Sequence, residues 1–237
     1  MFRWAIAYIT LAGLSAPAHA DLVLKCKQAN KPQDRINACT SLIAQEGDNG
    51  ANLSSALYHR ALAHYYAKTY VSTLADLTRL LAIKPDHVKA LDQRGVTYRK
   101  IGEADKAIAD HSKAISFSPG YARAYRNRGN AFFFKGQTQR AIADYSRAIE
   151  LKPDYANAIN ERGAAYENLR DFRKAVQDYS RLVELLPKNA DAYNNRGYAF
   201  HQLGDRARAI ADYQQALRLN PALVQPRENL KALGIGS

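Results

Sequence analysis

The chain has 237 residues, of which 47% are hydrophobic and 24% are charged, and its formal net charge at pH 7 is +12. This composition is ordinary for a soluble protein, and the length alone predicts one or two domains. Beyond its first twenty residues the sequence has no segment that is long and apolar enough to span a bilayer, which argues against an integral membrane protein.

Residues 1–20 have the three regions of a secretory signal peptide. Arg3 supplies the positive charge, residues 4–14 form an apolar run, and Ala18-His19-Ala20 is a small-x-small cleavage site. We therefore expect cleavage after Ala20 and a periplasmic or secreted mature chain. An uncleaved membrane anchor is the alternative, but the apolar run is shorter than the ~20 residues that a spanning helix needs; a buried helix is less favoured still.

The next segment, residues 21–53, is predicted to form a degenerate capping helical hairpin that is broken near Asn30 to Pro32. It contains both cysteines of the chain, Cys26 and Cys39. In an exported protein a close cysteine pair in a small hairpin is typical of a disulfide. Two buried free thiols are the alternative, and a metal site is disfavoured because no histidine lies nearby at ligand spacing.

From residue 54 onward the sequence repeats every 34 residues without insertion. The period is marked by two sets of residues: Gly95, Gly129, Gly163 and Gly197, and Pro85, Pro119, Pro153, Pro187 and Pro221. In each repeat apolar residues recur at intervals of three and four, which predicts two amphipathic helices. Gly102, Gly136 and Gly204 mark the turn between the helices, where Arg170 stands in the fourth repeat, and the prolines end the second helices.

A 34-residue helix-turn-helix unit with Gly or Ala, aromatic residues, Ala and Pro at fixed places resembles the tetratricopeptide repeat. The resemblance implies an all-α fold: a right-handed superhelical solenoid of stacked antiparallel helix pairs, with N- and C-terminal capping helices. Residues 224–237 would be the C-terminal capping helix and tail, with Leu230 and Leu233 on its apolar face. The five units would be residues 54–87, 88–121, 122–155, 156–189 and 190–223.

Some charged residues stand at the same place in every repeat, which predicts a structural role for them. We expect each arginine to pair with an aspartate of its own or a neighbouring repeat, although a partly exposed pair contributes only ~0–1 kcal/mol. The arginines are Arg60, Arg94, Arg128, Arg162 and Arg196, and the aspartates are Asp76, Asp110, Asp144, Asp178 and Asp212.

The sequence contains no familiar catalytic arrangement. It has no phosphate loop, no nucleophile elbow, no His-Glu-x-x-His and no cysteine beside a base. His64 and His111 stand where other repeats have core aromatic residues, so they are predicted to be packing residues. His59 and His201 are expected on the inner face, where they are solvated or take part in binding. We therefore expect no enzymatic activity, no cofactor and no metal.

Residues that differ between repeats on the inner face are the better candidates for recognition. The resemblance implies that the concave groove is lined mainly by the first helix of each repeat, so that it runs from aromatic through basic to amide-rich and mildly acidic. The predicted groove residues are Tyr58, Tyr65, Tyr66, Arg99, Arg123, Arg126, Asn127, Asn130, Phe133, Phe134, Asn160, Asn194 and Asn195.

The middle repeat is the most basic. Residues 122–155 hold seven positive and three negative side chains, whereas residues 156–189 hold six and five. Arg126 with Asn130 one turn later suits an anionic group, since a guanidinium donates two aligned hydrogen bonds. This partly resembles the carboxylate clamp by which some members of the family hold chaperone tails, but Glu161, Asp191 and Asn195 stand in place of that clamp's remaining residues.

These patterns favour a non-enzymatic scaffold that binds a peptide or helical segment of another exported or envelope protein. Arg123, Arg126 and Asn130 would be its polar anchors, and Tyr65, Tyr66, Phe133 and Phe134 its apolar ones. One alternative is an anionic polymer or membrane surface bound by the basic repeats, among which nucleic acid is the least favoured because the aromatic residues follow core spacing. Self-association is the other alternative.

Overall fold

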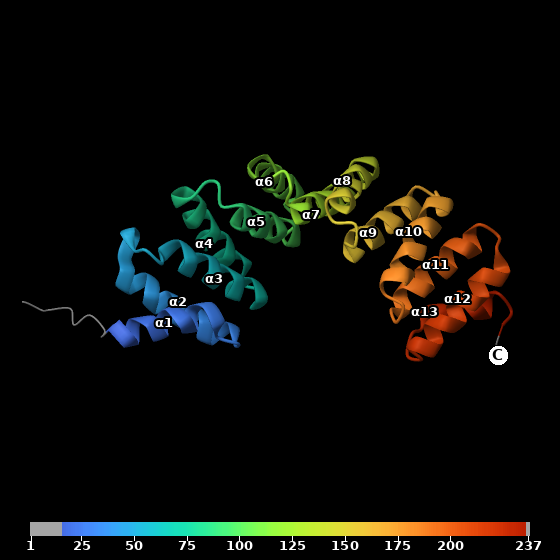
Figure 1. The fold of residues 1–237 in the computed structure, drawn as a ribbon, viewed down its shortest axis with the longest axis horizontal. Helices are drawn as coiled ribbons and strands as arrows, with labels where there is room; N and C mark the ends of the chain where they lie inside the picture. The colour runs from blue at the N-terminus through green and yellow to red at the C-terminus, as the bar shows by residue number, and fades with distance from the viewer. Residues whose placement is uncertain (1–15, 236–237) are drawn as a thin grey trace, which may run out of the picture. The chain divides into compact units, whose positions relative to one another are not determined.

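The computed structural model describes residues 16–235. This part of the chain forms thirteen α-helices and one short 3-10 helix and holds no strand (Figure 1). The predicted fold class, an all-α array of helix pairs, is confirmed. None of the helices in residues 16–235 is long and apolar enough to cross a membrane.

The chain divides into two compact parts, residues 1–97 and residues 98–237, here called the N-terminal and C-terminal parts. The N-terminal part contains α1 (Ala16–Gln28), α2 (Pro32–Glu46), the 3-10 helix η1 (Gly47–Asn49), α3 (Leu53–Tyr66), α4 (Tyr70–Ile83) and most of α5 (Val88–Lys100). The C-terminal part contains α6 (Ala104–Phe117), α7 (Ala122–Phe134), α8 (Thr138–Leu151), α9 (Ala156–Asn168), α10 (Phe172–Leu185), α11 (Ala190–Gln202), α12 (Arg206–Leu219) and α13 (Gln225–Ala232).

Within each part, helices that follow one another in the sequence pack together. In the N-terminal part α2 contacts both α1 and α3, and α3 contacts α4; in the C-terminal part the sequence of contacts runs from α6 to α13. The first helices α7, α9 and α11 begin 34 residues apart, at Ala122, Ala156 and Ala190. Each repeat therefore buries its apolar faces on its neighbours rather than in one central core.

The turn between the two helices of a repeat needs one residue in the left-handed conformation. Gly136 and Gly204 fill this place with φ of 72° and 80°. Arg170 fills it in the fourth repeat with φ of 60°, and Lys68 fills it in the first with φ of 61°. The turn is thus retained without glycine, at the steric cost that a Cβ carries in this conformation.

The close approach of the two helices within a repeat explains why a glycine recurs in the first helix every 34 residues. A Cβ added to Gly163 would lie 2.7 Å from the Tyr179 ring, and one added to Gly129 would lie 2.7 Å from the Tyr145 ring. Both tyrosines are almost completely buried, as is His111 at the equivalent place of the second repeat. The prediction that His111 is a packing residue is confirmed; His64 is half-buried, and its Nδ1 lies 2.8 Å from the Thr69 hydroxyl.

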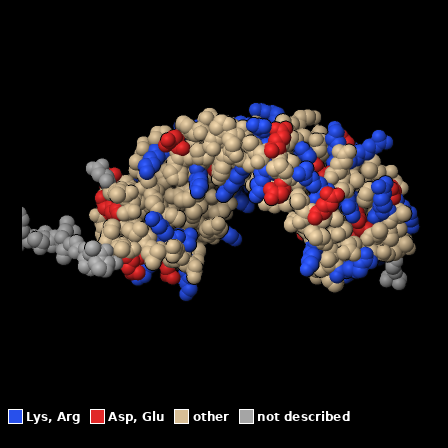
Figure 2. All heavy atoms as spheres, in the orientation of Figure 1, with Lys and Arg blue, Asp and Glu red and all other residues tan. Residues whose placement is uncertain are grey.

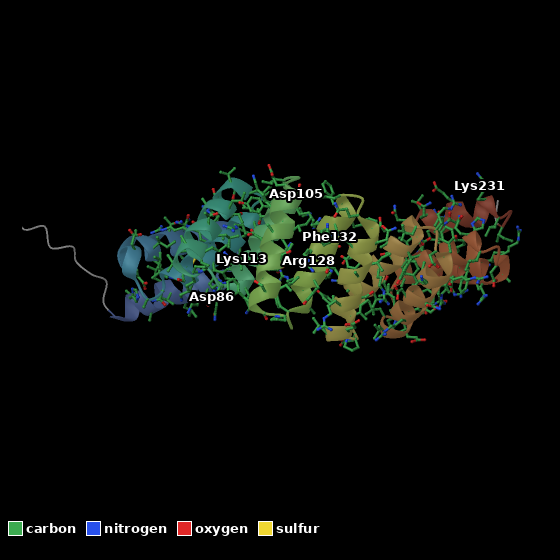
Figure 3. The ribbon with its side chains drawn as sticks, turned by 90° about the horizontal axis from the view of Figure 1, so that it is seen from above. Asp86, Asp105, Lys113, Arg128, Phe132 and Lys231 are labelled. Carbon is green, nitrogen blue, oxygen red and sulfur yellow. A yellow bond between two sulfur atoms is a disulfide. The ribbon has the colours of Figure 1, made fainter. Side chains whose placement is uncertain are left out.

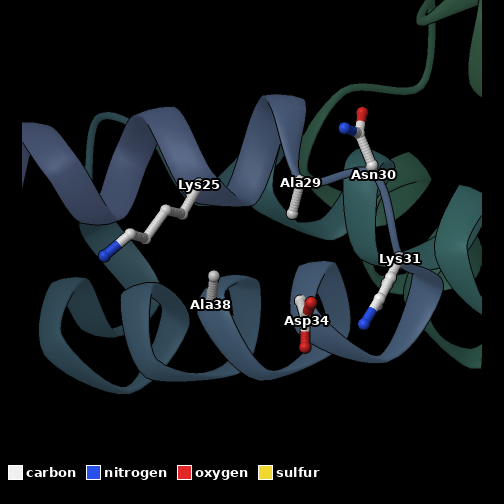
Figure 4. A pocket seen from close by; sticks show the side chains of 6 residues that line it. All are labelled: Lys25, Ala29, Asn30, Lys31, Asp34 and Ala38. Atoms are coloured by element: carbon white, nitrogen blue, oxygen red, sulfur yellow. The ribbon is translucent and has the colours of Figure 1, made fainter.

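The N-terminal hairpin is closed by the predicted disulfide, since Cys26 on α1 and Cys39 on α2 are bonded and buried. Its turn is held by Arg35, whose Nη2 donates to the Ala29 carbonyl at 2.7 Å. A shallow pocket lies between the two helices (Figure 4), lined by Lys25, Ala29, Asn30, Lys31, Asp34 and Ala38. None of these was predicted as a binding residue.

Most of the predicted signal peptide, residues 1–15, lies outside the described residues. Residues 16–20, which include the predicted cleavage site, form the start of α1. At the other end, α13 packs against α12, and Leu230 and Leu233 are buried as their apolar pattern predicts.

Candidate binding surface on the first helices

The recurrent arginines of the first, third, fourth and fifth repeats are structural, as predicted. Arg162 on α9 binds Asp178 on α10 through two hydrogen bonds of 2.9 and 2.6 Å, and its Nη1 donates to the Ser146 hydroxyl on α8 at 3.0 Å. One guanidinium thereby joins three helices. The hydrogen bonds that Arg162 donates to Asp178 raise the pKa of Arg162 above its ordinary value despite partial burial. The equivalent pairs, each within one repeat, are Arg60 with Asp76, Arg128 with Asp144, and Arg196 with Asp212.

These arginines also cover aromatic rings. On α7 the guanidinium of Arg128 lies 5.8 Å from the centre of the Phe132 ring, and Figure 3 shows the two side chains beside each other. Arg140 on α8 covers the same ring at 3.9 Å.

The sequence analysis did not predict the hydrogen bonds from these arginines to serine. The constant 16-residue spacing from Ser112 to Arg128 and from Ser146 to Arg162 is a signal that could have identified them.

The residues that differ between repeats form two clusters in the C-terminal part. The first, here called the arginine–carboxylate cluster, comprises Arg99, Arg126, Asn130, Tyr145 and Glu161. Arg126 on α7 donates to Glu161 on α9 through Nε at 2.7 Å and also through Nη2. Asn130 donates to the same carboxylate at 3.2 Å and accepts a 2.7 Å hydrogen bond from the Tyr145 hydroxyl.

This cluster corrects one expectation. Arg126 and Asn130 were predicted to receive a partner's anionic group, but the carboxylate that they hold belongs to Glu161 of the same chain. Burial disfavours the charged form of Arg126, but the hydrogen bonds and charge of Glu161 outweigh it and raise the pKa of Arg126. A partner's carboxylate would have to displace Glu161 from this site.

Arg99 leaves the cluster with an excess positive charge. Its buried Nε has no hydrogen-bond partner among the described residues. Burial raises the pKa of the Tyr145 hydroxyl, and the charge of Glu161 adds to this, whereas Arg126 and Arg99 lower it. The charge of Asp144 also raises this pKa, but Asp144 is paired with Arg128. Arg99 and Arg126 therefore outweigh Glu161, and the cluster as a whole attracts negative charge.

The second cluster is a pocket of about 150 Å³ between α9 and α11, here called the asparagine pocket. It brings together two of the predicted residues, Asn160 and Asn195, whose side chains are joined by a 3.3 Å hydrogen bond. Asn194 donates to Asn195 at 3.5 Å. The remaining lining residues are Ala156, Asn157, Leu182, Leu186, Asn189, Asp191 and Ala192. Asn189, which also caps α11 through Ala192, was not predicted.

Glu167, near the end of α9, carries a half-buried carboxyl group. Burial raises the pKa of Glu167 to about 7, although a hydrogen bond from Tyr179 opposes the shift. Its buried Oε1 has no hydrogen-bond partner among the residues described. Glu167 is thus protonated or ionised according to small changes in pH near neutrality.

The predicted aromatic residues differ in exposure. On α7, Phe134 is 62% exposed and Phe133 is 36% exposed, and Arg123 is exposed at the start of the same helix. In the N-terminal part Tyr66 is 69% exposed, and the Tyr65 ring contacts both Tyr66 and Tyr70. These side chains lie where a partner could reach them.

Asn127 does not. It was predicted as a groove residue, but only 6% of it is exposed. Glu161 and Asn195 stand at its place in the next two repeats, and each is bonded to the preceding first helix. In those two repeats this place therefore contacts the preceding first helix.

Charge is mixed rather than segregated on the C-terminal part. On the face shown in Figure 2, Lys and Arg side chains are interleaved with Asp and Glu side chains there. Among residues 16–235, no group of three or more His, Cys, Asp or Glu side chains is arranged to hold a metal ion.

The helix pairs, their 34-residue register and the glycine–tyrosine contacts define a class of repeat protein, and comparison with known families identifies it. A family model described as TPR repeat matches residues 95–136, 129–169 and 171–204, and one described as Tetratricopeptide repeat matches residues 190–223. Together they cover more than half of the sequence. The chain belongs to the tetratricopeptide-repeat family.

Solved structures show the same fold. MamA is 26% identical over 73% of this chain and 96% of its own, with a TM-score of 0.63. PilW, described as a type IV pilus biogenesis factor, is 17% identical over 90% of this chain and 97% of its own, with a TM-score of 0.77. YrrB, described as a TPR protein with an unusual peptide-binding site, is 18% identical over 83% and 99%, with a TM-score of 0.66. A search of curated protein sequences finds no match.

Proposed function

We propose that this protein is an exported interaction scaffold that binds an extended segment of another envelope protein along the first helices α7, α9 and α11. The observation that carries this proposal is the asparagine pocket. Its amide groups come from two neighbouring first helices and from the loop between them, so the pocket is built by the stacking of repeats.

The chemistry of the pocket suits a peptide backbone. Each asparagine side chain offers both a donor and an acceptor, as a peptide unit does. The hydrogen bond from Asn195 to Asn160 occupies the Asn160 carbonyl, and Asn194 occupies the Asn195 carbonyl, so the Asn160 NH2 is the group that can donate to a ligand. Backbone recognition by amides gives affinity with little dependence on the partner's side chains.

Residues on α7 would supply the specificity. Phe134 offers an exposed apolar anchor, and Arg123 offers a positive charge at the other end of the helix. The excess charge of the arginine–carboxylate cluster favours a segment with acidic side chains. Tyr65 and Tyr66 offer further apolar contacts in the N-terminal part.

Two further observations support a protein partner and an envelope location. Relatives of the same fold include a protein with a peptide-binding site and a pilus biogenesis factor, according to their descriptions. The first twenty residues have the pattern of a signal peptide, and the Cys26–Cys39 disulfide is of the kind that forms in oxidising compartments.

The test is capture of partners from an envelope extract by residues 21–237. The Asn160→Ala/Asn195→Ala variant should lose a protein that the unmodified chain retains at moderate salt. A control variant, Gln139→Ala/Gln214→Ala, removes two exposed amides from the second helices α8 and α12 and should retain it. Equal capture by the three proteins would overturn the asparagine pocket as the seat of binding, and capture that vanishes at moderate salt would favour an anionic surface instead.

A further inference from the structure

A pocket in the N-terminal part lies apart from the surface used above. It has a volume of about 360 Å³ and lies among the start of α3, the end of α4 and the start of α5. Tyr58, His59, Lys84, His87 and Lys89 line it, and the first turn of α3 adds two serine hydroxyls. Of these, Tyr58 was predicted as a groove residue, and His59 was expected on the inner face.

Ring contacts hold the floor of this pocket. The Tyr58 ring lies 5.8 Å from the His59 ring and 5.4 Å from the His87 ring, measured between centroids. His87 is fixed further because its Nδ1 accepts a 3.1 Å hydrogen bond from the Ala90 backbone N–H. The proton of its neutral ring therefore resides on Nε2, which leaves that nitrogen as a donor.

The surroundings of the two histidines are mainly positive. Burial lowers the pKa of His59, and the charges of Arg35 and Lys27 lower it further. Burial also lowers the pKa of His87; its own backbone and Asp86 oppose this shift, and Lys84 and Lys89 add to it. In the described part of the chain, the charges that shift these two pKa values are thus four cations and the carboxylate of Asp86.

We propose that this pocket binds a phosphate group. Lysine ammonium groups, serine hydroxyls and an imidazole N–H are point donors that can surround a tetrahedral anion from several sides. The two lysines of the lining, Lys84 and Lys89, would act as point charges, which is how lysine binds phosphate in other proteins. The aromatic floor would contact the organic group that carries the phosphate.

Proton linkage gives this site a characteristic pH dependence. A bound dianion would stabilise the protonated form of His59, and that of His87 at the expense of its hydrogen bond from Ala90, so binding takes up protons and affinity rises as the pH falls. Sulfate is the suitable probe for this measurement, because its charge stays constant between about pH 6 and about pH 8. Sulfate affinity should increase several-fold as the pH falls from about 8 to about 6.

The experiment is an NMR titration of the histidine ring signals of residues 21–237 with inorganic phosphate, compared with chloride at equal ionic strength. His59 and His87 should shift in a saturable manner with phosphate alone. The Lys84→Met/Lys89→Met variant should bind about tenfold more weakly, as expected for the loss of two charge-assisted contacts. The Lys113→Met/Lys231→Met variant removes the same charge from two exposed lysines of the C-terminal part (Figure 3) and should bind as the unmodified chain does.

A second variant protects the result against misfolding. His87→Asn keeps a side-chain acceptor for the Ala90 N–H and should fold normally, while sulfate binding loses much of its pH dependence. Sedimentation with phosphatidylglycerol vesicles, with and without glycerol phosphate as competitor, then distinguishes a lipid headgroup from a small phosphate ester. No saturable shift, or equal binding by the unmodified chain and the Lys84→Met/Lys89→Met variant, would overturn the proposal.

Discussion

At the scale of single residues, the same residue type does different work according to its place in the repeat. Arg162 is structural because its carboxylate partner, Asp178, is 4% exposed and belongs to the paired helix. Arg126 faces the neighbouring first helix and binds Glu161 there. Recurrence in every repeat marks the first kind, and occurrence in a single repeat marks the second.

Arg162→Met should lower the free energy of unfolding by about 3 kcal/mol, because Asp178 would remain buried without its partner. Urea unfolding measures the effect. Arg147→Met is the matched control, since its pair with Glu150 is exposed on both sides, and its unfolding midpoint should not change. A similar midpoint for both variants would show that the recurrent pairs do not stabilise the fold.

Glu167 makes a second prediction at this scale. Its pKa lies near 7 in the folded chain and near 4.5 in the unfolded chain. The folded state therefore binds more protons between these values, and this residue's effect on stability becomes unfavourable as the pH rises from about 4.5 to about 7. Because solvent screens this partly exposed carboxyl group, the loss should be only about 2 kcal/mol, and it should be complete above pH 7.

The comparison that isolates this effect is unfolding of the unmodified chain and of Glu167→Gln across the same pH range. His59, His64 and His87 act in the opposite direction, since their lowered pKa values make folding less favourable at acid pH. They are present in both proteins and cancel in the difference. A difference that does not vary with pH would contradict the assignment to Glu167.

At the scale of helices, the repeat depends on close packing between its first and second helix. In the first repeat, Ala61 and Leu77 stand at the places that Gly163 and Tyr179 occupy in the fourth. Both residues of this pair are fully buried. Beside a tyrosine ring the first helix needs glycine, whereas beside leucine it accommodates alanine. This pairing rule connects the sequence marker to the packing.

Gly163→Ala should therefore destabilise the protein by about 2 kcal/mol, because the new methyl group would overlap the Tyr179 ring. Gly163→Ala/Tyr179→Leu copies the pair found in the first repeat and should recover part of the loss. Thermal unfolding of Gly163→Ala, Tyr179→Leu and the double variant measures this. A double variant that loses as much stability as the two single variants together, or more, would show that the two residues are not coupled as described.

At the scale of the whole molecule, periodicity predicted the helix pairs and the Arg–Asp pairs, because each rests on local spacing or on a contact repeated at a fixed interval. The disulfide was predicted from the closeness of the two cysteines and the expected oxidising compartment. It did not predict the Arg126–Glu161 pair or the asparagine pocket, because these depend on how one first helix lies against the next. Both contain contacts 35 residues apart, Arg126 to Glu161 and Asn160 to Asn195. That interval is one repeat plus one residue, and it would have identified both contacts.

Asn127 was also predicted as a groove residue, and it is buried. A list of groove positions carried over from the family treats each repeat alone and cannot distinguish a contact with a partner from a contact between repeats. The exposed residues Phe134 and Asp191 avoid this ambiguity. They are the positions at which a bound segment can be detected with the least disturbance.

The most direct test of the central proposal is photo-crosslinking in the producing cells, with a photoreactive residue placed singly at Phe134 or Asp191 on the first helices, or at Gln139 or Gln214 on the second helices. All four side chains are exposed. The account predicts that Phe134 and Asp191 give an adduct with the same envelope protein and that Gln139 and Gln214 do not. Adducts from the second helices alone, or adducts of equal strength from all four positions, would contradict binding along the first helices.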